Sequence, residues 1–257
     1  MDDDNTNTKK RKGNTKYNIS YSKMSILDAG KRLGFWIDEL KAMPVAEMLA
    51  SEKDNFDGEV GDAILRVKQK VYDNIVECLD IEGYPTEANQ SFKEANVSDL
   101  VYSIISPIIF EFRSRTGRKG VRLEREKAII STDKETGGEE EFVVVDRIAV
   151  GEERFVLIIE GKKGTTGEAL KQCLLSLKDA GDQNSGCAVY GFITTGEFWQ
   201  MIRYDGTFQM TEKFMVLFNT MGKQKDRWMK ENSVVVDCLY VALQNGGVVK
   251  QDVMVVA

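Results

Sequence analysis

Two apolar segments of the chain, EFVVVDRIAV and FVLIIEGKKG, each have a carboxylate side chain directly after an apolar run. Asp146 follows three valines in the first segment, Glu160 follows five apolar residues in the second, and Lys162 comes two positions after Glu160. Long apolar runs are typical of central strands, where charged residues are rare. If a turn within Gly151–Arg154 joins the two strands, we expect Asp146 to lie roughly opposite Glu160, with their Cβ atoms about 4.5–5.5 Å apart.

These three side chains have the chemistry needed to hydrolyse a phosphodiester. Two carboxylates at this separation can share one hard cation, and Mg²⁺ typically takes one or two carboxylates together with waters and phosphate oxygens. Lys162 shares a strand face with Glu160 and can orient a metal-bound water or stabilise negative charge on the phosphate. The alternative is that the spacing arises by chance, because 30% of the chain is charged and both acids stand near strand ends.

The order of these residues is similar to that of a known superfamily. Asp146, a hairpin, the EGK motif at 160–162 and a helix with Gln172 resemble the PD-(D/E)xK nucleases, and more narrowly the nuclease-like domains of Crinkler-type effector proteins and their fungal relatives. The segments KEANVSDLVYSIISPII upstream and AVYGFITTGEFWQMIRYDG downstream extend the resemblance over about residues 91–210. One departure is Val145, which stands where the motif has proline.

The resemblance implies a role for each of five residues. Asp146 and Glu160 would be metal ligands for Mg²⁺ or Mn²⁺, Lys162 the catalytic lysine, Gln172 a supporting residue on the following helix, and Glu94 the acid that completes the metal shell. Two simpler interpretations stay open. Gln172 also suits the polar side of an amphipathic helix, and Glu94 also suits a helix N-terminus, where the helix dipole favours a carboxylate.

The resemblance also implies an α/β fold, with a restriction-endonuclease-like core in the order α-β-β-β-α-β and a mixed sheet flanked by helices. Apolar periodicity predicts a long helix over 58–79, a helix over 91–115 that Pro107 kinks or divides, and a single C-terminal helix over 222–245. The expected organisation is a disordered basic tail at 1–20, an added helical region at 21–90, the nuclease-like core at 91–220, and a C-terminal helix and strand at 221–257 that complete the core.

Composition excludes several kinds of chemistry. The 257 residues contain no histidine, which excludes Ser-His-Asp and Cys-His hydrolases and histidine-ligated metal sites. The four cysteines are scattered without a C-x-x-C pair, which argues against a zinc ribbon. Widely spaced cysteines also favour a reducing, intracellular compartment. No uninterrupted apolar run approaches 18 residues, so we expect no membrane span.

The charge of the chain is unevenly distributed. The net charge of −6 argues mildly against a nucleic-acid partner, but a basic segment follows the Pro107 helix and could track a phosphate backbone along the mouth of the site. A solvated loop and exposed strand face explain the same segment. The candidate nucleic-acid-binding residues are Arg113, Arg115, Arg118, Lys119 and Arg122.

The predicted function is therefore a metal-dependent nuclease, with DNA as the expected substrate. Many nucleases of this kind need two sites to cut both strands, so a homodimer is one expected arrangement. Lys9-Lys10-Arg11-Lys12 resembles a nuclear localisation signal, and a non-specific DNA contact is its other interpretation. The alternative function is a catalytically inactive module that keeps the nuclease fold and binds nucleic acid or a protein partner.

Overall fold

The structure is a computed structural model, and it describes residues 16–50, 58–85, 89–163 and 166–248. The predicted localisation signal at 9–12 lies outside the described residues, as does nearly all of the predicted final strand at 248–256. Part of the predicted tail is ordered, because Ile19–Ser20 form strand β1, which pairs with Thr136–Gly137.

One sheet organises the described part of the chain. Its strand order is β1-β4-β5-β6-β7-β8-β2, with β3 beside β4 and β9 beside β7. Pairing is antiparallel from β3 through β5, parallel between β5 and β6, and antiparallel from β6 to β7 and β8. The strands are β1 Ile19–Ser20, β2 Ala42–Met43, β3 Val121–Ile130, β4 Thr136–Ala149, β5 Glu152–Gly161, β6 Val189–Thr194, β7 Phe198–Tyr204, β8 Phe208–Thr211 and β9 Phe214–Met215.

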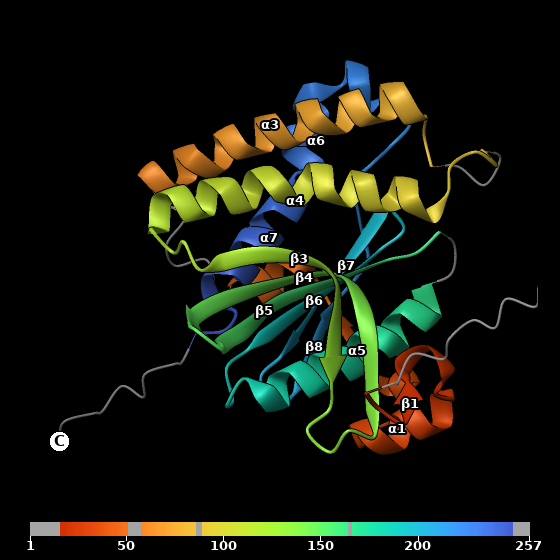
Figure 1. Ribbon diagram of the computed structural model, residues 1–257. Helices are drawn as coiled ribbons and strands as arrows, with labels where there is room; N and C mark the ends of the chain where they lie inside the picture. Colours follow the sequence, from red (N-terminus) through yellow and green to blue (C-terminus); the bar gives the residue numbers. More distant parts are fainter. Residues whose placement is uncertain (1–15, 51–57, 86–88, 164–165, 249–257) are drawn as a thin grey trace, which may run out of the picture.

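Helices cover both faces of this sheet (Figure 1). Helices α4 and α7 pack on one face with α3 outside α4, while α5 packs on the other face beside α1. The α/β class with a mixed sheet flanked by helices is confirmed. The helices are α1 Ile26–Leu33, α2 Val45–Ala50, α3 Glu59–Glu82, α4 Glu94–Thr116, α5 Thr166–Gln183, α6 Lys225–Glu231 and α7 Val234–Asn245, with short 3₁₀ turns η1 Tyr21–Lys23, η2 Ile37–Glu39 and η3 Met221–Lys223.

The apolar runs of the sequence form the centre of the sheet. Four of the residues Phe155–Ile159 in β5 are fully buried, because α4 and α7 cover one face of this strand and α5 the other. A strand buried on both faces has no need for alternating polar residues. The elements α4, β3, β4, β5, α5 and β6 follow one another in the expected α-β-β-β-α-β order.

Of the two predicted effects of Pro107, a kink or a division, the division does not occur, because α4 is one helix through this residue. Proline has no N–H to donate to the carbonyl four residues earlier, which here belongs to Ser103. Asn74 of α3 supplies the missing donor, with its Nδ2 3.0 Å from the Ser103 oxygen. A tertiary hydrogen bond therefore compensates for the proline.

The C-terminal segment forms two helices rather than the predicted single one. Helix α6 ends at Glu231 and α7 begins at Val234. The side chain of Asn232 donates to the Met215 carbonyl at 2.9 Å, and this contact with the sheet region fixes the corner between the helices. The predicted helical region at 21–90 is also not purely helical, because Ala42–Met43 pair with β8 at one end of the sheet's strand order.

Helix α4 is long and apolar enough to cross a membrane by length and composition. Half of its apolar window is buried inside the fold, where nine of its residues belong to the core. A core helix of this kind passes the same composition test as a membrane span.

Candidate functional site

The register of the β4–β5 hairpin separates Asp146 from Glu160. Asp146 pairs with Arg154, while Phe142 pairs with Ile159. Arg154 lies six residues before Glu160 along β5, which at the rise of a strand puts Asp146 roughly 20 Å from Glu160. The prediction that the two carboxylates oppose each other is wrong, because the turn is tight and lies close to Asp146, and two register shifts interrupt the hairpin.

Asp146 instead forms a structural ion pair at the other end of the sheet. Its Oδ2 lies 2.6 Å from Arg118 Nη2 and 3.1 Å from Arg118 Nε. The same guanidinium donates from Nη1 to the Leu243 carbonyl at 3.0 Å and stacks over the ring of Phe112. Asp146 and Arg118 therefore join β4 to α4 and α7, and they do not contribute to a site with Glu160.

Two buried carboxyl groups lie close together at the C-terminal end of β5, next to Lys162. Glu160 is 3% exposed and Glu140 of β4 is 1% exposed. Burial and the charge of Glu160 raise the pKa of Glu140 well above its ordinary value, and a hydrogen bond between the two side chains adds to the effect. The Oε2 atom of Glu140 is buried and has no hydrogen-bond partner among the described residues. A buried carboxyl oxygen without a hydrogen-bond partner lowers the stability of the fold, so binding of a proton or a cation at this oxygen is favoured.

Glu141, the next residue of β4, approaches the same end of β5 from the side of α4. Its Oε2 accepts from the amide of Gly161 at 3.2 Å, and its Oε1 accepts from the hydroxyl of Ser98 on α4. Burial raises the pKa of Glu141 to about 7, opposed by the Gly161 hydrogen bond and reinforced by the charge of Glu160.

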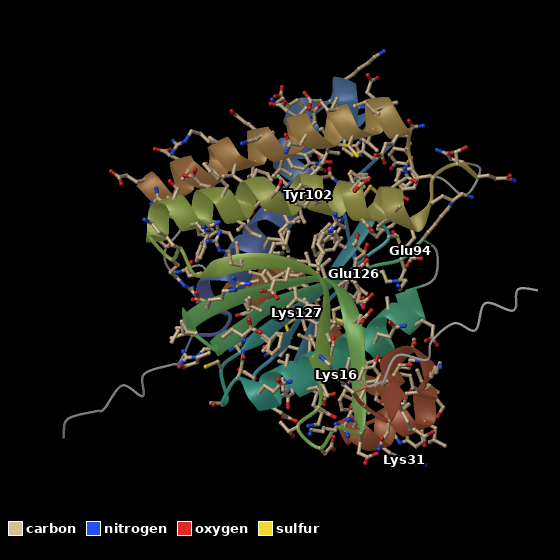
Figure 2. All side chains as sticks on the ribbon, in the orientation of Figure 1. Lys16, Lys31, Glu94, Tyr102, Glu126 and Lys127 are labelled. Carbon is tan, nitrogen blue, oxygen red and sulfur yellow. The ribbon has the colours of Figure 1, made fainter. Side chains whose placement is uncertain are left out.

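Lys162 lies between Glu160 and Glu94. Its Nζ is 3.7 Å from Glu160 Oε2 and 2.8 Å from Glu94 Oε1. Glu94 lies at the N-terminal end of α4 (Figure 2). Burial lowers the pKa of Lys162, but the hydrogen bond to Glu94 and the charges of both carboxylates outweigh it, so the pKa lies above the ordinary value. The Lys162 amide donates to the Thr194 carbonyl at 2.9 Å, which fixes the backbone beside β6.

Gln172 does not join this group. It is partly buried on α5, and no hydrogen bond links its side chain to the described residues around Lys162. The neighbouring residue Cys173 faces the carboxyl groups from α5. Burial, and then the charges of Glu140 and Glu160, raise the pKa of the Cys173 thiol.

We call this group the carboxylate site. It brings together three of the predicted residues, Glu94, Glu160 and Lys162, and it adds Glu140 and Glu141, which the motif analysis missed. The signal was present in the letters GGEEEF, because a tight turn places residues just before Phe142 opposite the end of β5. The members are Glu94, Ser98, Glu140, Glu141, Glu160 and Lys162.

The donor set suits a hard divalent cation with few protein ligands. Within the described ranges, no three Asp, Glu or Cys side chains form a group ready to hold a metal ion. Mg²⁺ usually keeps several waters and takes one or two carboxylates from the protein. The Glu140–Glu160 pair, with its unpaired buried oxygen, provides that number.

The predicted basic residues lie away from Lys162. Arg115 stands 21 residues along α4 from Glu94, which corresponds to about 32 Å at the rise of a helix. Its guanidinium donates to the Glu59 carbonyl at 3.2 Å, and Lys119 is exposed near the same helix end. Arg113 and Arg122 line a groove between α4 and β3, whereas Arg115 and Arg118 line a separate one beside α3, α4 and α7.

Comparison with known proteins adds no relative to this picture. No protein-family model matches the chain, and no curated protein matches it.

Proposed function

We propose that the protein is a metal-dependent nuclease that hydrolyses phosphodiester bonds at the carboxylate site, with DNA as its substrate. The observation that carries the proposal is the buried Glu140–Glu160 pair with Lys162 two residues beyond Glu160. Burying two carboxyl groups side by side is costly, because both cannot be ionised there without repulsion, and groups perturbed in this way cluster at functional sites.

The element order supports a restriction-endonuclease-like core. In the observed α4-β3-β4-β5-α5-β6 order, the acid of β4 that approaches the end of β5 is Glu140 rather than Asp146. We therefore assign the metal-binding role of the first motif acid to Glu140 and keep Glu160 as the second ligand.

Four residues of the carboxylate site have distinct roles in this proposal. Bound Mg²⁺ or Mn²⁺ would polarise the phosphate and activate a water. Glu140 and Glu160 would hold the ion through their carboxylate oxygens. Lys162 donates from Nζ to a non-bridging phosphate oxygen and stabilises the charge that develops there. Glu94 keeps Lys162 protonated and in place through the 2.8 Å hydrogen bond.

Nicking of a supercoiled plasmid in the presence of Mg²⁺ or Mn²⁺ tests the proposal. We expect nicking by the full chain, and a loss of at least about 100-fold in Glu160→Gln and Lys162→Ala, because each removes a group that acts on the phosphate or the metal. Glu139→Gln is the matched control, since Glu139 is exposed on the same strand. Nicking that survives undiminished in both site variants contradicts the assignment.

A non-catalytic binding module is the second candidate function. It is favoured by the lack of a three-residue metal group among the described residues and by the pairing of Lys162 with Glu94. Calorimetric titration with Mn²⁺ separates the two candidates. Binding that disappears in Glu160→Gln supports the nuclease, whereas no binding by the intact chain, with or without DNA, supports the module.

A further inference from the structure

A groove of about 540 Å³ runs between the outer side of α4 and strand β3. We call it the α4–β3 groove. None of its described lining residues is acidic, although the whole chain carries a net charge of −6. Its cationic and aromatic lining residues are Lys70, Tyr102, Phe110, Arg113, Arg122 and Arg125.

The cations of this groove are available for an anionic partner. Lys70 and Arg122 are exposed and form no ion pair with any residue that the structure describes. Arg113 has a buried Nε without a hydrogen-bond partner in the described part of the chain. Arg125 makes one long ion pair, 4.0 Å, with Asp99, and its guanidinium lies over the ring of Phe142, 4.7 Å from the centroid. Four positive charges in one groove, with only a distant carboxylate beside them, favour binding of a polyanion.

The aromatic rings indicate which polyanion fits. Tyr102 is 48% exposed and Phe110 is 69% exposed, so both rings offer a free surface in a groove. A cation lies by each ring, Arg125 at 5.7 Å from the Tyr102 centroid and Lys70 at 5.8 Å from the Phe110 centroid. Alternating cations and exposed rings are the means by which proteins hold single strands, where unpaired bases stack and phosphates meet the charges.

The groove leads toward the carboxylate site. Tyr102 stands one helical turn beyond Ser98, which contacts Glu141, and Figure 2 shows Tyr102 midway along α4 with Glu94 at its N-terminal end. From Tyr102 to Arg113 the helix extends about 17 Å. This length can contact a few nucleotides of a single strand.

We infer that the α4–β3 groove binds single-stranded nucleic acid, with bases stacked on Tyr102 and Phe110 and phosphates contacting Lys70, Arg113, Arg122 and Arg125. The inference deepens the proposed function by naming its substrate class, and it rests on that function for delivery of the strand to the carboxylate site.

Fluorescence anisotropy with the full chain in EDTA tests binding without cleavage. The probes are a labelled 12-nucleotide oligo-dT and a duplex of the same length. We expect the single strand to bind more tightly. Tyr102→Ala should weaken binding about 5- to 100-fold, while Tyr102→Phe should keep it, because a phenyl ring still stacks. Arg122→Gln should reduce the slope of log affinity against log salt by about 0.7.

Two control variants remove a cation and an aromatic ring that lie outside the groove. Arg115→Gln removes an exposed cation of the same basic segment, and Trp36→Ala removes an aromatic ring that is 58% exposed elsewhere. Neither should change the affinity. Thermal unfolding of every variant checks that the fold is intact.

Three results overturn the inference: equal or tighter binding of the duplex, equal loss in Arg115→Gln and Arg122→Gln, or competition by polyglutamate as effective as by oligo-dT at equal charge, which assigns the groove to an acidic peptide. Because the assay needs no metal, single-strand binding by a protein that cleaves neither the oligonucleotide nor the plasmid in Mg²⁺ contradicts the proposed function and supports the groove.

Discussion

The carboxyl groups of Glu140 and Glu160 are buried within hydrogen-bonding range of each other at the end of the sheet. Two like charges cannot both be ionised at such a distance without a counter-charge. Lys162 lies 3.7 Å from Glu160 and lowers the pKa of Glu140, but burial and Glu160 outweigh it. The raised pKa favours the protonated form of Glu140, and a divalent ion bound as proposed would have to displace that proton.

The protonated state of Glu140 leads to a first prediction, on Glu140→Gln. Glutamine reproduces the shape of a neutral glutamic acid and still donates to Glu160, so the melting temperature should stay within about 2 °C of wild type, or rise. Metal-dependent nicking should be lost by about 100-fold or more, because the amide is a poor ligand for Mg²⁺. Parallel thermal unfolding and nicking assays measure both. A variant that loses stability and activity together contradicts this account of Glu140.

The raised pKa of Glu141 leads to a second prediction, on stability against pH. The folded pKa of about 7 lies above the ordinary value of 4.5, so the folded state binds the proton more tightly than the unfolded state. This contribution to stability is complete below pH 4.5 and is lost as the pH rises through 7. Glu141→Gln cannot lose it, so the variant should gain stability relative to wild type between pH 5 and 8.5.

Because Glu141 is only half-buried, solvent screens part of this effect, and we expect a gain of ~1 kcal/mol, or about 2–4 °C in melting temperature. Glu139→Gln, an exposed neighbour, should show no such trend. If the melting temperatures of Glu141→Gln and Glu139→Gln change with pH in the same way, this would falsify the assignment of the raised pKa to Glu141.

The ion pair of Asp146 and Arg118 leads to a third prediction. The two side chains are only 12% and 25% exposed, so removing one partner leaves the other poorly solvated. Asp146→Asn should lower the free energy of unfolding by about 1–3 kcal/mol. The Asp146→Asn/Arg118→Met double variant should lose less than the sum of the single variants, because the pair acts as a unit.

Nicking by Asp146→Asn, normalised to folded protein, should match wild type, because Asp146 lies far from Glu160. Urea unfolding and the nicking assay measure the two quantities. Abolished nicking in a fully folded Asp146→Asn protein restores Asp146 to the catalytic group.

Asp146 and Glu140 also show how far the sequence could be interpreted. The apolar runs correctly predicted the strands and the α/β class, and three residues named with the motif, Glu94, Glu160 and Lys162, lie together while their roles stay predictions. The register of the β4–β5 hairpin could not be predicted from the apolar pattern. A two-residue turn and a four-residue turn leave that pattern unchanged, but they bring different residues of the two strands opposite each other. Glu140 was missed because its run of three glutamates looks like a solvated strand end, and its burial depends on the packing of α5 and η1 over that end.

The contact of Glu94 with Lys162 leads to a fourth prediction, which separates a positioning residue from a metal ligand. If Glu94 acts through Lys162, Glu94→Gln removes a charge that raises the pKa of Lys162. Lys162 should then lose its proton at a lower pH, and the alkaline limb of the pH–rate profile should move to lower pH, with kcat reduced up to about 10-fold. The Mg²⁺ concentration for half-maximal activity should not change.

A metal titration and a pH–rate profile on the same variant decide between these roles. Glu94 is 55% exposed and 2.8 Å from Lys162, so its charge acts on the lysine more directly than on an ion held by the buried pair. Lys93→Gln is the matched control, since Lys93 is an exposed neighbour at the same helix end. A raised Mg²⁺ requirement with an unmoved alkaline limb assigns Glu94 to the metal shell, because only a ligand changes the affinity for the ion without changing the protonation of Lys162.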